Sequence, residues 1–65
     1  MRGRPVKSSV EAVLIRGTRT QDGNWLAVCT VGGKQHAISL PSTFAFREGR
    51  RIRVIVEREG RAVLA

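Results

Sequence analysis

The chain is predicted to be all-β, folding as a small five-stranded barrel, on three observations. Its Val, Ile and Thr residues fall in short runs broken by Gly and Pro, as in strands joined by tight turns. Its 65 residues suit one small domain at most. Its composition, 42% hydrophobic and 26% charged, is that of a chain with an apolar core. We expect residues 1–8 to form a flexible basic arm and residues 9–65 the small β-barrel domain.

The first three strands follow from apolar runs and the turns between them. Strands are expected over residues 10–16, 25–31 and 34–40, with a polar loop over residues 17–23. Gly32-Gly33 predicts a two-residue hairpin turn, since such a turn needs positive φ at both positions. A turn centred there places four cross-strand pairs on one largely apolar face, which we predict to be the core face. The pairs are Val31 with Lys34, Cys29 with His36, Ala27 with Ile38, and Trp25 with Leu40.

The sequence after residue 40 predicts a connector and a second hairpin. Pro41 to Gly49 form the connector, with room for one helical turn and with Phe44 and Phe46 as barrel plugs. Strands are expected over residues 51–58 and 61–65. A two-residue turn at Glu59-Gly60 then pairs Val56 with Val63 and Val54 with Ala65 on the core face, and sets Arg58 opposite Arg61.

Positive charge is the main functional signal of the composition. The formal net charge is +7, from 12 Lys and Arg residues, ten of them Arg, against five acidic residues. Such a surface attracts polyanions, and the forked donors of Arg suit phosphate groups. We therefore expect a nucleic-acid-binding protein with DNA, or RNA, as its partner and with a regulatory or architectural role.

The candidate contact residues on the barrel are mainly arginines. Arg51 and Arg53 alternate along one strand and share its outer face, which makes a stripe for a phosphate backbone, although a merely solvated face fits the pattern equally. Trp25 opens the second strand beside a loop and is the candidate for stacking on a base. The full predicted barrel set is Arg16, Arg19, Trp25, Lys34, Arg50, Arg51 and Arg53.

The N-terminal arm carries a short local motif. Arg2, Gly3, Arg4 and Pro5 resemble the core of an AT-hook, and Lys7 adds a further cation. Pro5 keeps the backbone extended, and Gly3 lets it lie deep in a narrow groove. The resemblance implies that the two Arg side chains run along an A·T-rich minor groove. A nonspecific phosphate-binding arm is the alternative.

Two fold-level resemblances remain open. The strand order, with a connector after the third strand, resembles a five-stranded Greek-key barrel, OB-like or SH3-like. Residues 35–64, from Gln35-His36 through Leu40-Pro41 to Arg58-Glu59-Gly60, also resemble the swapped-hairpin DNA-binding domain of bacterial antitoxins and transition-state regulators. That second resemblance implies an intertwined β dimer. This sequence departs from the family pattern in the spacing after Phe46 and in ending at Ala65.

Other functional classes are disfavoured by the residues present. The longest apolar run, Trp25 to Cys29, has five residues, so no membrane partner is expected. Cys29 and His36 are each single, which leaves no disulfide, no structural zinc site, no expected cofactor and no assembled catalytic group. We expect a cytoplasmic, nucleoid-associated protein of a prokaryote or mobile element, and not an enzyme. A homodimer, an adaptor whose basic face meets an acidic protein partner, and a small-anion-binding barrel remain alternatives.

Overall fold

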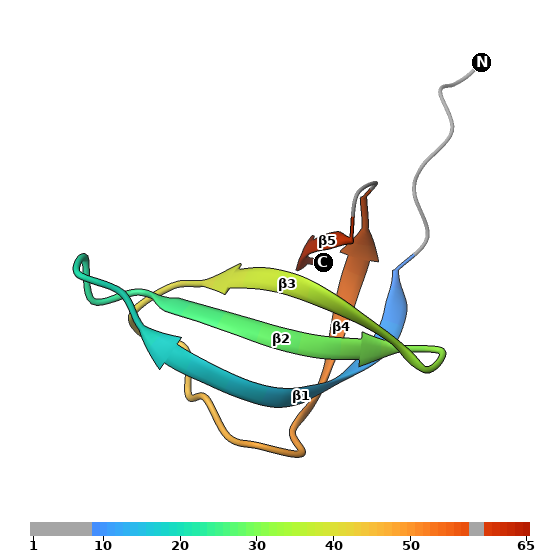
Figure 1. The fold of residues 1–65 in the computed structure, drawn as a ribbon, viewed down its shortest axis with the longest axis horizontal. Helices are drawn as coiled ribbons and strands as arrows, with labels where there is room; N and C mark the ends of the chain where they lie inside the picture. Colours follow the sequence, from blue (N-terminus) through green and yellow to red (C-terminus); the bar gives the residue numbers. More distant parts are fainter. Residues whose placement is uncertain (1–8, 58–59) are drawn as a thin grey trace.

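Five strands close into a single barrel in the computed structural model, which describes residues 9–57 and 60–65. They are β1 (Val10–Arg19), β2 (Trp25–Val31), β3 (Lys34–Leu40), β4 (Arg51–Val56) and β5 (Arg61–Leu64). The strand order around the barrel is β1-β2-β3-β5-β4, and β4 pairs with β1 to complete it. In Figure 1, β1, β2 and β3 lie side by side as a curved sheet that β4 crosses, and the short β5 lies next to β3. The predicted small five-stranded all-β barrel is confirmed.

The first strand is longer than predicted. β1 continues to Arg19, and Gly17 and Arg19 pair with Ala27 and Trp25 of β2. The loop predicted over residues 17–23 is therefore wrong in its first half. A shift in pairing between Leu14 and Arg16 marks a β-bulge, which bends β1 so that it pairs with both β4 and β2.

The β2–β3 hairpin has the predicted register throughout. Val31 pairs with Lys34 across the Gly32-Gly33 turn, whose two residues have φ of 57° and 83°. Trp25 pairs with Leu40 at the other end of the hairpin. The glycines fix the length of the turn, and the length of the turn fixes which residues pair and share a face.

The β4–β5 hairpin is shifted by one residue from the prediction. Val56 pairs with Ala62, and Val54 pairs with Leu64, whereas the sequence predicted Val63 and Ala65 as their partners. The backbone N–H of Glu57 donates to the carbonyl of Arg61 at 2.8 Å. Arg58, the predicted partner of Arg61, lies outside the described residues. Such a shift fits a three-residue loop ending in a glycine of positive φ, and Gly60 has φ of 72°.

The core is apolar, with no buried polar or charged side chain among the described residues. Because side chains alternate along each strand, every strand contributes one or two residues to it. The one-residue shift buries Ala62 and leaves Val63 40% exposed, the reverse of the predicted arrangement. The buried residues are Ala12, Leu14, Ala27, Cys29, Ile38, Leu40, Ile52, Val54 and Ala62.

The connector over residues 41–50 has turns where one helical turn was expected. Phe44 N–H donates to the Pro41 carbonyl at 3.0 Å, and two backbone hydrogen bonds join Leu14 of β1 to Gly49 and Arg50, at 2.7 and 2.9 Å. The connector therefore passes beneath β1, as Figure 1 shows in yellow and orange. Its Phe44 and Phe46 pack against the core as predicted, although both stay partly exposed.

Candidate nucleic-acid interface

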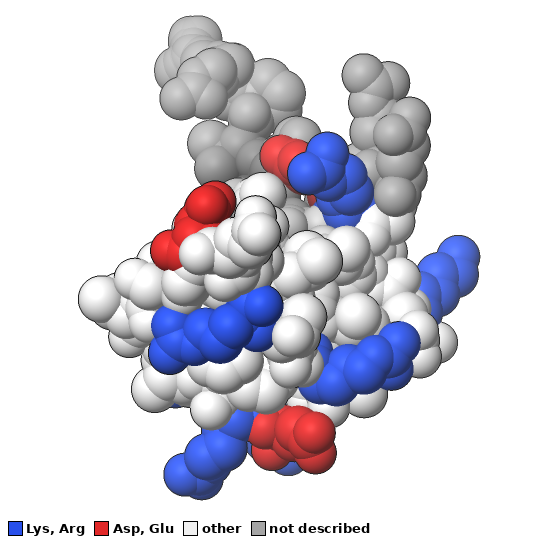
Figure 2. All heavy atoms as spheres, turned by 60° about the vertical axis from the view of Figure 1, so that its left-hand side comes forward, with Lys and Arg blue, Asp and Glu red and all other residues white. Residues whose placement is uncertain are grey.

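The basic side chains of the described residues are all exposed. The face shown in Figure 2 carries separate blue groups with uncharged surface and acidic side chains between them. One ion pair joins opposite charges among residues 9–57 and 60–65. The exposed cations there are Arg16, Arg19, Lys34, Arg47, Arg50, Arg51, Arg53 and Arg61.

Arg51 and Arg53 lie on the outer face of β4, as the alternation of that strand predicted. Arg51 pairs with Glu11 at 3.9 Å, and its side chain is 78% exposed, so this ion pair is loose and its partner is readily exchanged. Arg53 is held more firmly, because its guanidinium donates to the Ser9 carbonyl at 2.9 Å and to the Ser9 hydroxyl at 3.0 Å. Arg51 is thus the freer of the two for a phosphate.

Arg19 braces one end of the barrel. Its guanidinium lies 4.5 Å from the ring centre of Trp25 and donates to the carbonyls of Gly23 and Ser42, the latter at 3.4 Å. These contacts join the β1–β2 turn to the start of the connector. Because one guanidinium serves three partners, Arg19 has fewer free donors for a phosphate than its exposure suggests.

Trp25 is packed against other side chains at this end. Its ring stacks on Phe46 with centroids 4.8 Å apart and 22° between the planes. Phe46 in turn rests on Gly17, where an added Cβ would lie 2.7 Å from its ring. The Trp25 indole nitrogen is buried without a hydrogen-bond partner. Phe46 and Arg19 therefore already occupy stacking positions on the ring that was predicted to stack on a base.

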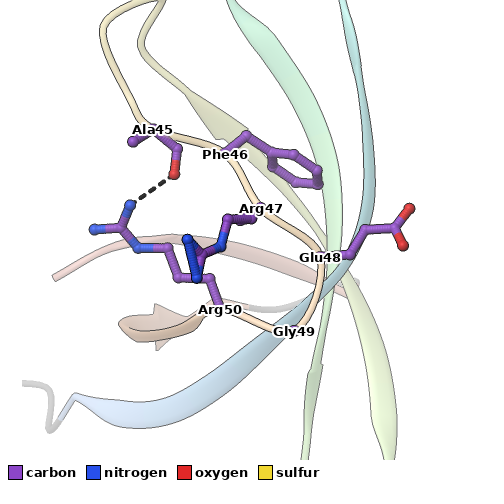
Figure 3. Close-up of a pocket in the computed structure, with 6 residues that line it drawn as sticks. All are labelled: Ala45, Phe46, Arg47, Glu48, Gly49 and Arg50. Atoms are coloured by element: carbon purple, nitrogen blue, oxygen red, sulfur yellow. Dashed lines mark hydrogen bonds between the residues drawn. The ribbon is translucent and has the colours of Figure 1, made fainter.

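Arg50 and Arg47 line an open pocket in the connector. Arg50 lies 4.7 Å from the ring centre of Phe44, and its guanidinium donates to the Ala45 carbonyl at 2.6 Å. The pocket has a volume of about 330 Å³ and is formed by residues 45–50 alone. Figure 3 shows the Arg47 and Arg50 side chains on the same side of the connector, with Glu48 pointing away from them.

A shallow apolar groove crosses the outer face of β1, β2 and β3 next to Arg16. It has a volume of about 410 Å³ and is lined by Leu26 and Val28 of β2 and Ala37 of β3. Leu26 and Ala37 also line the neighbouring hollow toward β5, which holds Val63 and Arg61. Leu26 is 50% exposed. Strand pairing aligns Arg16, Val28, Ala37 and Arg61 in one row, so the apolar surface has an arginine at each end.

Cys29 and His36 are cross-strand partners, as predicted. Cys29 is fully buried, and desolvation raises the pKa of its thiol, an effect partly offset by a backbone hydrogen bond. The Nδ1 atom of His36 is buried without a hydrogen-bond partner, so this atom does not accept a hydrogen bond from the Cys29 thiol. Within the part of the chain that the structure describes, no three His, Cys, Asp or Glu side chains gather as metal ligands.

The predicted site residues thus fall into separate places. Arg19, Trp25 and Arg50 lie beside the connector, and Lys34 lies at the β2–β3 turn. The AT-hook-like residues Arg2, Gly3, Arg4, Pro5 and Lys7 lie outside the described residues. The predicted set omitted Arg47 and Arg61. The cluster of four arginines over residues 47–53 was the available signal for Arg47, whereas Arg61 depended on the register of β5.

Comparison with protein families, curated proteins and solved structures gave no significant match. None of the described residues forms a helix long and apolar enough to cross a membrane.

Proposed function

We propose that this chain is a nucleic-acid-binding protein that contacts phosphate groups of duplex DNA through arginine side chains, with a regulatory or architectural role and no covalent chemistry. The observation that carries the proposal is the exposed and largely unpaired positive charge. Eight Lys and Arg side chains of the described residues are exposed, and one of them, Arg51, is in an ion pair. A surface of this kind attracts nucleic acid at rates that fall with salt.

The packing of the aromatic rings favours phosphate contacts over base stacking. The chain has one Trp, two Phe and no Tyr. Trp25 and Phe46 stack on each other, and Phe44 is covered by Arg50. Proteins that bind single strands without sequence preference use exposed rings on which bases stack. The described surface offers no such free ring, which supports a duplex as the ligand. A five-stranded barrel is compatible with the OB-like resemblance, an architecture that also binds oligonucleotides.

Fluorescence anisotropy tests this proposal directly. Labelled A·T-rich duplex, G·C-rich duplex, single-stranded DNA and RNA are titrated at two salt concentrations with the full chain and with residues 1–7 deleted. We expect the duplexes to bind in a salt-sensitive manner, and the shortened chain to keep duplex binding through the barrel while losing any A·T preference. Absence of binding to all four ligands would overturn the proposal.

A protein-interaction module is the second candidate, favoured by the apolar groove. Leu26 and Val63 are 50% and 40% exposed and face neighbouring hollows on the same side of the barrel. Arg16 and Arg61 at its two ends would suit an acidic polypeptide. Binding of polyglutamate by the wild-type chain but not by a Leu26→Glu variant, with no binding of any nucleic acid, would favour this function instead.

A further inference from the structure

The connector pocket brings together two cations that lack an acidic partner. Arg47 and Arg50 both line it, and neither forms an ion pair with an acidic side chain of residues 9–57 or 60–65. Glu48, the one acidic residue of the segment, also lines the pocket, but its carboxylate points away from the two arginine side chains (Figure 3). Two neighbouring like charges repel each other, so an anion bound between them would be stabilised by both.

The backbone holds these two residues at a fixed spacing. Arg50 N–H donates to the Arg47 carbonyl at 3.1 Å, closing a turn in which Gly49 has φ of 84°. The last two residues of this turn are fastened to β1, because Leu14 accepts a hydrogen bond from Gly49 and donates one to Arg50. The pocket is therefore built on a segment anchored to a strand of the barrel.

Contacts within the connector orient the Arg50 side chain. It lies over the Phe44 ring at 4.7 Å and donates from Nη1 to the Ala45 carbonyl at 2.6 Å. A guanidinium carries five N–H donors, so these contacts fix its direction and leave other donors for a ligand. A preoriented group loses less conformational entropy on binding than a free one.

We propose that this pocket is a binding site for one phosphate group, which accepts hydrogen bonds from both Arg47 and Arg50. The inference rests on the proposed function when the phosphate belongs to a nucleic-acid backbone. The same chemistry would accept a terminal or free phosphate, since both present several oxygens to the two guanidinium groups. Arg47 was absent from the set predicted from sequence and is the residue that this proposal adds.

Side-chain Nε–H resonances of the ¹⁵N-labelled full chain provide the test. The chain is titrated with sodium phosphate against sodium chloride of equal ionic strength, and then with a DNA duplex with or without a 5′-phosphate. The expected result is a shift of the Arg47 and Arg50 signals with phosphate and not with chloride. Arg47→Gln should weaken phosphate binding about tenfold, as loss of a charge-assisted hydrogen bond implies, whereas the matched variant Arg61→Gln should leave it within about twofold.

The outcomes separate this inference from the proposed function. If the duplex binds but the Arg47 and Arg50 signals do not move, the pocket proposal is overturned and the proposed function stands. The pocket proposal is also overturned if Arg47→Gln and Arg61→Gln weaken phosphate binding equally. If phosphate moves both signals and no duplex binds, the pocket stands and the proposed function fails. A response that requires the 5′-phosphate assigns the pocket to terminal phosphates.

Discussion

Gly17→Ala should destabilise the barrel, although a Gly-to-Ala change in a strand is normally favourable. Gly17 lies in β1 without a positive φ, so its backbone suits alanine. An added Cβ would nevertheless stand 2.7 Å from Cε2 of Phe46 and 3.0 Å from Cζ. That ring is held from another side by its stack on Trp25. The Phe46 ring can therefore lie in this position because residue 17 has no side chain.

Two opposing free energies decide the sign of this effect. Alanine gains roughly 0.5–1 kcal/mol over glycine inside a strand, because it loses less backbone entropy on folding. Overpacking costs about 1–3 kcal/mol, and displacement of the ring also weakens an aromatic pair that contributes about 0.5–1.5 kcal/mol. We expect a net loss of roughly 1–2 kcal/mol. For a domain of this size such a loss lowers Tm by about 4–8 °C per kcal/mol.

Urea titration followed by tryptophan fluorescence measures the loss in free energy of unfolding and reports on displacement of the Phe46 ring. Trp25 is the one Trp of the chain, so its emission reports on the stacked pair itself. Thr18→Ala is the control, since that neighbouring side chain is exposed. Phe46→Leu should relieve the overlap, which makes the double variant more stable than additivity predicts. A Gly17→Ala protein as stable as wild type, with unchanged Trp25 emission, would refute the reasoning.

Three further predictions follow from the described contacts. Arg19→Gln should lower the free energy of unfolding in urea by about 1 kcal/mol, because it removes a cation–π contact and side-chain hydrogen bonds. The outward-facing Arg16→Gln should have an effect under about 0.5 kcal/mol, and equal losses would contradict a bracing role for Arg19. Burial raises the folded-state pKa of Cys29, so its stabilising contribution is complete below the unfolded pKa of roughly 8.5 and is lost as pH rises through the folded value. Urea titrations from about pH 8 to 10 should show a smaller decline for Cys29→Ala than for wild type, and parallel declines would contradict this. Ala62→Ser should cost about 1–3 kcal/mol in thermal unfolding, since it buries a hydroxyl, and Val63→Ser should cost less; the opposite order would restore the register predicted from sequence.

The sequence predicts the β2–β3 hairpin correctly because two local signals agree there. Gly32-Gly33 sets the length of the turn, and the polar residues Thr30 and Gln35 pair with each other on the face opposite to Cys29. A register with one buried face is strongly specified under these conditions. The bounds of both strands and every pair between them follow.

The β4–β5 hairpin lacks such agreement. Val63 and Leu64 are adjacent apolar residues, so hydrophobicity alone allows either one to lie on the side of the core. Gly60 suits a two-residue or a three-residue loop equally. The observed pairing turns Val63 outward, where it joins the apolar surface beside Leu26. That surface is absent from the sequence-based account because the predicted register buried Val63.

The candidate interface shows a similar division. Excess positive charge and the run of arginines at residues 47–53 are readable directly. Which arginines also brace the fold depends on where the connector lies. Arg19 donates to the carbonyl of Ser42, 23 residues away in the chain, and no local sequence pattern predicts that contact. The extension of β1 to Arg19 was likewise hidden, because polar residues there suit a loop as well as an exposed hairpin.

The most direct test of phosphate recognition by the barrel compares two variants of the ion pair between Arg51 and Glu11. Arg51→Gln removes a cation that is 78% exposed, and Glu11→Gln removes the carboxylate 3.9 Å from it. The association constant for duplex DNA is measured by anisotropy across a series of salt concentrations. The account predicts that Arg51→Gln weakens binding and lowers the log–log salt slope by about 0.9, the value for one phosphate contact, whereas Glu11→Gln tightens binding. Identical salt slopes for both variants and wild type would contradict it.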